Sequence, residues 1–423
     1  MQRESAGSIL SIAGSIVGNF LLRCASSSAL AIAALYLAHI DRLYYKVPAT
    51  FLGLLAVAFY STELILSPVL GSLSDRLGRR PFLWLGGVFG ACGALLLSVA
   101  PALPLFILAK VAQGVSTASS VPAVLGHLAA ATSHSVAVRG RVMVLFETAT
   151  VLGFAIGFAV GGILWDRIQV GSFYVVALLY LSAMVAFVTV QQTPTAATLR
   201  RGWQFYKTLL RHAPTLSFAP AWIGVNAILG LWFTHLGFQM AKINDPSQLL
   251  VGGFSGSTIG LVLAAIAIVF VVGTAGWALA FGRIPTTTIM ASALTALALF
   301  CLVLYILNHT PEGAIVRIGV LITIVMLILL AVSGFTPAAL AYLAEISEHF
   351  PDNRGSMMGL YSVFLGLGQL LGGWVGGFFA ESWGVDGLIF ATALLGLASN
   401  ASLYLITRSP TPNKQPMRET VAS

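Results

Sequence analysis

Long apolar runs alternate with short polar breaks along the whole chain. Twelve such runs lie between charged or turn-forming residues. A helix needs roughly 20 apolar residues to cross the hydrocarbon core of a bilayer, where it satisfies its own backbone hydrogen bonds. The pattern therefore predicts twelve membrane-spanning helices, at residues 14–39, 48–72, 82–100, 104–129, 142–165, 172–191, 217–241, 256–280, 285–307, 315–343, 356–380 and 386–407.

The only long polar interruption follows the sixth run and divides the chain. We predict an N-terminal six-helix bundle at 1–191, a linker at 192–216, a C-terminal six-helix bundle at 217–407 and a tail at 408–423. The linker sequence LRRGWQFYKTLLRH gathers its basic and polar side chains on one helical face, which is typical of an amphipathic helix lying on a membrane surface. The predicted fold class is all-α, a polytopic membrane protein built from two six-helix bundles.

Composition supports a membrane protein and gives its orientation. Of the 423 residues 58% are hydrophobic and 9% are charged, with a formal net charge of +8. If both termini are cytoplasmic, fifteen Lys and Arg residues lie on the inner side and five on the outer side. An excess of Lys and Arg marks cytoplasmic loops, so we predict a multi-pass protein of the plasma membrane with both ends inside. The expected partners are the lipid bilayer and a small-molecule substrate, not nucleic acid, and we expect a monomer.

The two predicted bundles repeat one another at an offset of 215 residues. The repeated features are an Arg-Gly pair, a proline and a glycine series. They pair Arg139 and Gly140 with Arg354 and Gly355, Pro122 with Pro337, and Gly153, Gly157, Gly161 and Gly162 with Gly368, Gly372, Gly376 and Gly377. Small residues at such spacings let membrane helices pack closely. We therefore predict a helix-packing role for both glycine series.

A charged loop, GSLSDRLGRRP at residues 71–81, separates the second and third predicted spans. It resembles the signature of the major facilitator superfamily, which carries it at this place. GFAIGFAVGG at 153–162 resembles the fifth-span glycine motif of that superfamily's proton-coupled antiporters, with Phe158 in place of proline. The resemblance covers all twelve spans and implies a secondary transporter of drug/proton antiporter-like type.

Within the charged loop, Asp75 can face a helix N-terminus, where roughly half a positive charge is exposed. The resemblance implies that this terminus belongs to the eleventh span, near Arg354, and that the contact closes the cytoplasmic side. The corresponding sequence of the second half, GWALAFGRIP, has Leu279 at the place of Asp75, so only one such latch is expected. The predicted latch residues are Gly71, Asp75, Arg76, Gly78, Arg79, Arg80 and Arg354.

Four charged side chains lie well inside predicted spans: Arg23, Glu63, Lys110 and Glu147. A charge in the bilayer interior costs several kcal/mol unless it is paired or hydrated. Arg23 and Glu63 lie at similar depths on consecutive spans, so we expect an ion pair that either locks the two helices or acts as a proton switch. Glu147 is the preferred coupling acid, the alternative being a carboxylate hydrogen-bonded to Thr150 or to another span.

Polar side chains on the first and fourth spans form stripes that need water or a ligand beside them, and the resemblance places the first, fourth, seventh and tenth spans around a central cavity. Lys110 stands where the family has arginine. The second half offers neutral polar and aromatic residues instead. The candidate cavity residues are Asn19, Gln113, Thr117, Asn226, Trp232, Phe233, Gln239, Thr336 and Gln369.

The predicted function is transport of a small apolar or amphipathic organic solute by alternating access, as proton-coupled efflux. Uptake of a sugar-like or metabolite solute, and flipping of an amphipathic lipid, remain as alternatives. No nucleotide-binding loop, metal-ligand spacing or catalytic serine elbow occurs in the sequence. We therefore expect no enzymatic activity, metal or cofactor, and a proton gradient as the energy source.

Overall fold

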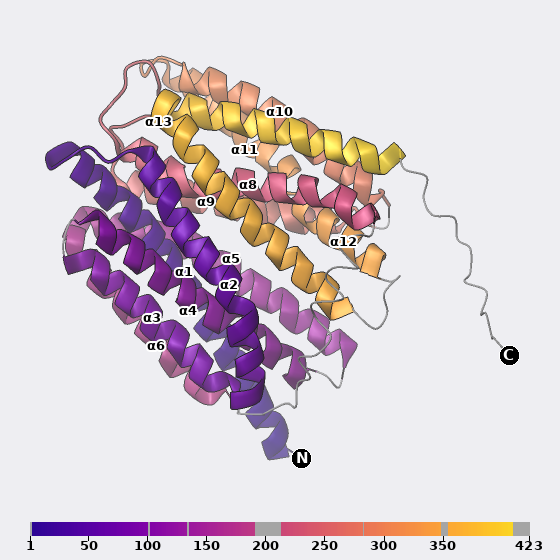
Figure 1. Cartoon of the computed structure of the whole chain (residues 1–423). Helices are drawn as coiled ribbons and strands as arrows, with labels where there is room; N and C mark the ends of the chain where they lie inside the picture. The colour runs from indigo at the N-terminus through magenta and orange to yellow at the C-terminus, as the bar shows by residue number, and fades with distance from the viewer. Residues whose placement is uncertain are drawn as a thin grey trace.

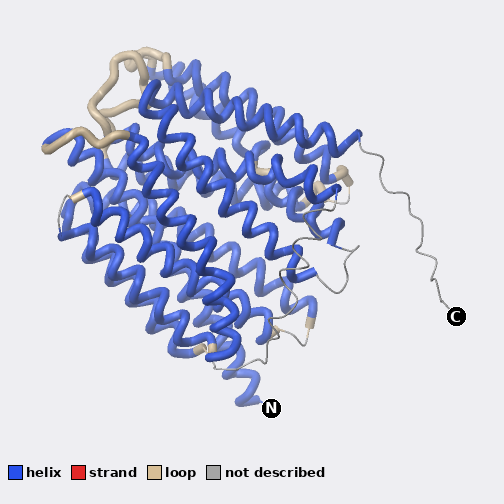
Figure 2. The backbone as a smooth tube through the Cα atoms, in the orientation of Figure 1, coloured by secondary structure: helices blue, strands red, loops and turns tan. Residues whose placement is uncertain are grey.

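The chain folds into long helices joined by short loops (Figures 1 and 2). The computed structural model describes residues 2–99, 102–132, 135–190, 213–281, 283–347 and 354–408. At some positions within these ranges the structure describes the backbone and not the side chain. These positions are 2–8, 136, 137, 140, 213–217, 344–347, 354–362 and 405–408. The predicted amphipathic linker helix lies outside the described residues, up to the first residue of α8, Ala213.

Among the described residues each half contributes six spans; in the second half one span is divided between two helices, and the last helix contains two spans. The first half holds α1 (Gln2–Leu43), α2 (Ala49–Leu77), α3 (Arg79–Val99), α4 (Leu103–Ala131), α5 (Val136–Ile168) and α6 (Ser172–Ala186). The second half holds α8 (Ala213–Ala241), α9 (Gly256–Ala278), α10 (Thr286–Asn308), α11 (Ile315–Val332), α12 (Phe335–Ser347) and α13 (Arg354–Arg408). Short 3₁₀ segments, Gln169–Gly171 and Phe187–Thr189, flank α6.

The twelve predicted spans are confirmed. Nine stretches of the described residues are long and apolar enough to cross a bilayer. Two of them, Arg141–Thr189 and Val363–Tyr404, each contain two predicted spans. Helix α4 covers the predicted fourth span but is not among the nine, because its buried polar residues lower its mean hydropathy. Within α13 the chain reverses at Gly384, whose φ of 59° separates the last two spans.

The predicted tenth span is broken. It consists of α11 and α12, which are separated at Ser333 and Gly334. The indole Nε1 of Trp277 on α9 donates to the carbonyl oxygen of Leu330 at 3.0 Å, and Gly334 N–H bonds to Ala331 rather than continuing the ladder to Leu330. A Cβ on Gly334 would lie 2.6 Å from the Trp277 ring. The indole of Trp277 therefore forms a hydrogen bond with the Leu330 carbonyl oxygen at the helix break, and it leaves room only for glycine at position 334.

The two halves are distinguished in Figure 1 by colour, indigo to magenta for the first and pink to yellow for the second. Helices α2, α5 and α1 of the first half pack against α13, α9 and α8 of the second. We call the helix ends near residues 43–48, 168–171, 241–255 and 308–314 the outer end, and those near 77–79, 131–135 and 278–286 the inner end, following the orientation predicted from the loop charges.

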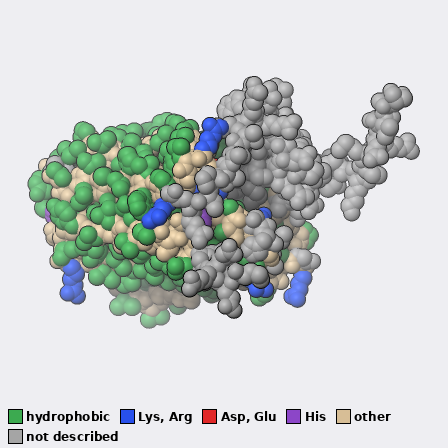
Figure 3. All heavy atoms as spheres, turned by 90° about the horizontal axis from the view of Figure 1, so that it is seen from below, with side chains coloured by type: hydrophobic (Ala, Val, Ile, Leu, Met, Phe, Trp, Pro, Cys, Tyr) green, Lys and Arg blue, Asp and Glu red, His purple; other side chains and the backbone are tan. Residues whose placement is uncertain are grey.

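Exposed side chains are mostly apolar. The coloured part of the face in Figure 3 is covered largely by hydrophobic side chains, with few Lys and Arg among them. Large exposed residues include Val316 and Leu279, which are 82% and 77% exposed. An apolar surface of this extent is unfavourable in water and favourable in lipid, as expected for a protein whose helices cross a membrane.

Candidate functional site

The fifth-span glycines form the seam between α5 and α1. A Cβ on Gly157 would lie 2.2 Å from the carbonyl oxygen of Cys24, so only glycine fits there. The close approach lets Ser28 Oγ donate to the Gly157 carbonyl oxygen at 2.8 Å. At the inner end of the seam, Asn19 Nδ2 donates to Thr150 Oγ1 at 2.8 Å. The glycine series therefore places the polar face of α1 directly against α5.

The eleventh-span glycines repeat this seam between α13 and α8. A Cβ on Gly153 would meet the Phe20 carbonyl oxygen, the Arg23 Cβ and the Cys24 nitrogen. A Cβ on Gly368 would meet the same three atoms of Ile223, Asn226 and Ala227. The internal repeat predicted from sequence is therefore a repeat of backbone packing. It also shows that neutral Asn226 occupies the place of charged Arg23 in the second half.

Arg23 lies between two carboxylates on different helices. Its guanidinium interacts electrostatically with Glu63 on α2 and Glu147 on α5. Its Cζ also lies 5.6 Å from the centre of the Phe154 ring. The expected ion pair with Glu63 is not closed, since neither carboxylate, both of them described, lies within 4.0 Å of the guanidinium nitrogens, and Arg23 Nε is buried without a hydrogen-bond partner. One cation is therefore shared between two acids in this conformation.

Glu147 lies on the face of α5 that is directed toward the second half. Residues seven and four apart share a helical face, which places Glu147 with Phe154 and Phe158. The Phe158 ring stacks on Phe233 of α8, with 5.9 Å between centres and 11° between planes. The Glu147 side chain itself is exposed. Phe158, which stands where the antiporter motif has proline, therefore forms an aromatic contact between the two halves.

Lys110 is a buried cation on α4 with an amide partner. Its Nζ donates to Gln113 Oε1 at 3.0 Å, and among the described residues no carboxylate lies within 4.0 Å of it. Thr117, one turn further, donates from Oγ1 to the Gln113 carbonyl oxygen at 3.3 Å. The predicted polar stripe is thus real, and it lies in the interior of the protein.

The polar residues predicted to line the cavity in the second half bond within that half. Asn226 Nδ2 donates to the Trp222 carbonyl oxygen at 2.8 Å, and Trp232 Nε1 donates to Thr392 Oγ1 at 2.9 Å. Gln239 Nε2 donates to the Ala380 carbonyl oxygen at 3.3 Å.

Two further candidates lie on α13 and α12. The backbone of Gln369 packs on α8, since a Cβ on Gly230 would lie 2.5 Å from the Gln369 carbonyl oxygen, and Thr336 on α12 is half-buried. Among these second-half candidates, Phe233 contacts the first half directly, through its ring contact with Phe158.

Among the described residues, the contacts of the charged loop lie within the first half. Gly78 has a φ of 94° and turns the chain from α2 into α3. Gly71 lies inside α2, where a Cβ would come within 3.1 Å of Pro122, so it serves close approach and not the reversal. Asp75 Oδ1 accepts a hydrogen bond from Arg79 Nη2 at 3.1 Å.

The three arginines of the loop differ in environment. The Arg79 side chain is only 6% exposed, and a Cβ on Gly126 of α4 would lie 3.2 Å from its Nε. Arg80 Cζ lies 4.9 Å from the Trp84 ring centre, and Arg76 is exposed. The side chain of Arg354 is outside the described residues, so the predicted latch to the eleventh span stays a prediction.

Two acids at the outer end, which the sequence analysis did not single out, join the halves. Asp166 at the end of α5 accepts hydrogen bonds from the backbone N–H groups of Gly256 and Ser257 at the start of α9. Glu381 on α13 accepts one from the N–H of Ala49, the first residue of α2. A signal was available, because the two acids stand at the same offset of 215 residues as the glycine series.

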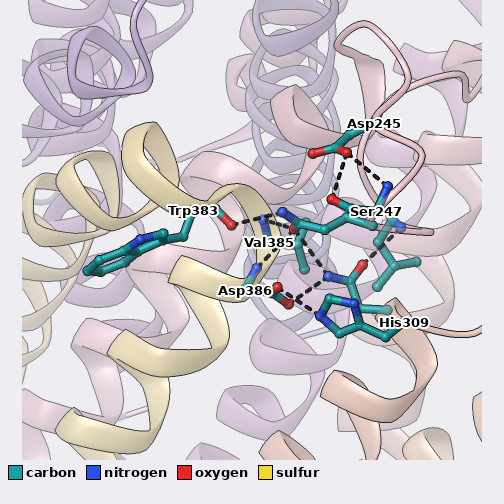
Figure 4. Close-up of polar contacts among 9 residues, drawn as sticks. Asp245, Ser247, His309, Trp383, Val385 and Asp386 are labelled. Atoms are coloured by element: carbon teal, nitrogen blue, oxygen red, sulfur yellow. Dashed lines mark hydrogen bonds and ion pairs between the residues drawn. The ribbon is translucent and has the colours of Figure 1, made fainter.

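A separate polar network fixes the outer end of the second half (Figure 4). Asp386 accepts hydrogen bonds from Asn308 Nδ2 at 2.9 Å and pairs with His309 Nε2 at 2.9 Å. Gln248 Oε1 accepts from the N–H groups of Val385 and Asp386. These bonds surround Gly384 and hold the reversal within α13 in place.

Comparison with known proteins identifies the family. The sequence profile described as the Major Facilitator Superfamily matches residues 15–329 and 250–422, which together cover nearly the whole chain. The chain belongs to the Major Facilitator Superfamily. As a superfamily member it is a multi-pass membrane transporter, as the charged loop and the glycine motif predicted.

Relatives and a solved structure agree with this membership. Multidrug resistance protein 1 of Bacillus subtilis is 24% identical over 335 residues, which is 78% of this chain and 80% of that protein. Quinolone resistance protein NorA of Staphylococcus aureus is 27% identical over 149 residues, 35% of this chain and 37% of NorA. The crystal structure of the nucleoside transporter NupG superposes with a TM-score of 0.73 at 14% identity, over 93% of this chain and 97% of that one.

The environment of Asp75 predicts a transport defect for Asp75→Asn. The substitution removes the charged partner of the buried Arg79 guanidinium, whose Nε and Nη1 already lack hydrogen bonds. A hydrogen bond to a charged group contributes about 2 kcal/mol. Asparagine keeps a neutral acceptor for Arg79 and so loses only part of this, about 1.4 kcal/mol. We therefore expect the transport rate to fall about tenfold, with little change in solute affinity. Ser72→Ala is the matched control, since Ser72 bonds only to Val69 of its own helix turn. A normal rate in Asp75→Asn would exclude this role.

Proposed function

We propose that this transporter exports small apolar or amphipathic organic solutes in exchange for protons by alternating access. The observation that carries the proposal is the arrangement of Arg23 between Glu63 and Glu147, on three helices of one half, at membrane depth. Two acids that share one cation cannot both be neutralised by it. When one acid is protonated, Arg23 interacts mainly with the other, which is still charged. Proton binding therefore changes which helix, α2 or α5, is held to α1 by the ion pair.

The chemistry of the surrounding residues favours an apolar or amphipathic solute. Phe154, Phe158 and Phe233 form a continuous set of ring contacts from the charged group to the second half. The polar groups of Asn226, Trp232 and Gln239 are already engaged inside the protein. Large aromatic surfaces and few free polar groups suit a solute bound by apolar contact, not by many hydrogen bonds.

Export, and not uptake, is supported by the glycine series on α5 and by the relatives. Two of those relatives are named as resistance proteins, one for multiple drugs and one for quinolones. Their names make export the better supported direction for this chain. The plasma membrane, with both chain ends in the cytoplasm, is the location consistent with the fifteen-to-five charge distribution.

Proteoliposomes test the proposal directly. Purified protein is reconstituted with ethidium as a cationic probe and Nile red as a neutral one, and a pH gradient is imposed across the vesicle. We expect gradient-driven movement of at least one dye, lost in Glu147→Gln or Glu63→Gln. Thr148→Val is the control, because the Thr148 hydroxyl bonds only to the Val144 carbonyl of its own helix. Dye movement that is indifferent to the gradient would remove proton coupling.

A further inference from the structure

We propose that Asp166 and Glu381 are a pair of positioning residues that hold the outer end closed during the transport cycle. Each acid lies on one half of the protein and caps the first turn of a helix of the other half. The proposal rests on transport by alternating access and adds two residues that act at the outer closure, away from the intramembrane charges. We call this pair the outer latch.

Asp166 completes the N-terminus of α9. The first N–H groups of a helix have no partner in the helix. In α9, Ser255 Oγ accepts from Thr258 N–H at 3.2 Å, and Asp166 supplies the remaining acceptors, with Oδ1 2.8 Å from Gly256 N and Oδ2 2.7 Å from Ser257 N. One carboxylate from the first half thus satisfies two donors of the second half, at a helix end that carries a partial positive charge.

Glu381 does the same for α2 in the reverse direction. The residue before α2 is Pro48, whose side chain makes no capping hydrogen bond. Glu381 Oε2 accepts from the Ala49 N–H instead. An acceptor that is usually local to a helix N-terminus therefore comes from the opposite half of the protein.

The two contacts are related by the internal repeat. Asp166 follows Gly162 by four residues, and Glu381 follows Gly377 by four. Both glycines carry backbone contacts between the halves: a Cβ on Gly162 would lie 2.1 Å from the Gly256 carbonyl oxygen, and one on Gly377 would lie 2.9 Å from the Thr50 Cα. One helical turn beyond each close approach, an acid meets a helix N-terminus. The outer end is therefore closed by two equivalent contacts, one from each half.

The latch is suited to reversible opening. Asp166 lines an outer cleft of about 230 Å³, and Glu381 lines a second one of about 510 Å³. When the halves separate, water in these clefts can form hydrogen bonds with the acids and the helix N–H groups. Each capping contact therefore contributes only modestly to the stability of the closed outer end. Arg42 on α1 also joins the halves nearby, where its Nη2 donates to the carbonyl oxygens of Ala241 at 2.9 Å and Lys242 at 3.4 Å. Arg42 is a cation that donates to the C-terminal end of α8, whereas each latch residue is an acid that accepts from a helix N-terminus. Arg42 is therefore not part of the pair.

The test measures opening of the outer end without any solute. Ala34 on α1 is 8% exposed and packs against α8, where a Cβ on Gly237 would lie 3.6 Å from the Ala34 Cβ. Cysteine at position 34, with Cys24, Cys92 and Cys301 replaced, reacts with a hydrophilic maleimide in proportion to the open population. Removing a helix cap costs a factor of about five, so we expect a rise of about fivefold for Asp166→Ala or Glu381→Ala, and ~25-fold for both.

Controls separate latch loss from general loosening of the fold. Asp386→Ala removes an outer acid that bonds only within the second half to Asn308 and His309, and should leave the rate at position 34 unchanged. Cys301 as the sole cysteine, buried in the second half, should react at the same rate in all variants. The charge-preserving Asp166→Glu should restore most of the closure.

The latch is contradicted if labelling at position 34 stays at the wild-type rate in the double variant, or if Cys301 accelerates equally. Either result leaves gradient-driven dye transport, and so the proposed function, standing. Conversely, a 25-fold rise in a protein whose wild type moves no dye would support the latch and reject proton-coupled export. If the alanine variants fail to fold, Asp166→Asn and Glu381→Gln carry the same comparison, with a smaller rise expected because the amides keep an acceptor.

Discussion

Gly162→Trp is expected to abolish transport by preventing closure of the outer end. Even a single Cβ at this position would lie 2.1 Å from the Gly256 carbonyl oxygen and 3.0 Å from the Gly260 Cα. Both opposing atoms belong to the backbone of α9, which cannot move aside without separating the halves. Overpacking a tight contact costs about 3 kcal/mol, and each 1.4 kcal/mol is a factor of about ten. The outer-open population should therefore rise by at least ~100-fold.

The measurement is the initial rate of dye transport, together with the maleimide reactivity of cysteine at position 34. The rate should fall below a hundredth of wild type while the reactivity rises. Gly319→Trp is the matched control, because Gly319 lies within helix α11 and a Cβ there would meet nothing within 4 Å. Transport by Gly162→Trp at the level of Gly319→Trp would show that this glycine contact does not open and close.

Arg23→Asn is expected to uncouple transport from the proton gradient. The substitution gives the first half the residue that the second half carries at the repeated position, Asn226 beside Gly368. Without the guanidinium, Glu63 and Glu147 lose the cation they share. The shared cation is what links protonation of one acid to the helix contacts of the other, so proton exchange at either acid can then no longer bias the cycle. We expect gradient-driven transport to fall at least tenfold and the residual rate to be insensitive to pH.

Two variants make this result specific. Arg23→Lys keeps the charge but loses the planar fork, so it should retain part of the coupling. Asn226→Ala alters the same packing position of the second half, where no charge is present, and should leave the pH dependence unchanged even if the rate falls. Gradient-driven transport by Arg23→Asn at the wild-type level would remove Arg23 from the coupling mechanism.

Much of the fold followed from local properties of the sequence. The length of each apolar run predicted the twelve spans, since crossing a bilayer requires a set number of apolar residues. The spacing of Gly153 and Gly157, repeated at Gly368 and Gly372, predicted close packing, and the structure shows the same backbone contacts in both halves. In these cases the sequence pattern that determines the structure lies within one helix or one repeated motif.

Relations between helices were predicted less well. Equal depth suggested an Arg23–Glu63 ion pair, but depth does not determine how a helix is rotated, and Arg23 is shared with Glu147. The break before α12 depends on Trp277 from another helix. The capping roles of Asp166 and Glu381 were not predicted, because the helix ends they cap lie about 90 and 330 residues away in the chain.

Paired distance measurements at the two ends of the molecule test alternating access most directly. Spin labels at Leu43 and Ile315 report the outer end, and labels at Leu77 and Leu279 report the inner end; all four side chains are exposed, and each pair joins the two halves. As pH or solute concentration is changed, the account predicts that the outer distance lengthens while the inner one shortens. Two distances that stay constant, or that lengthen together, would contradict it.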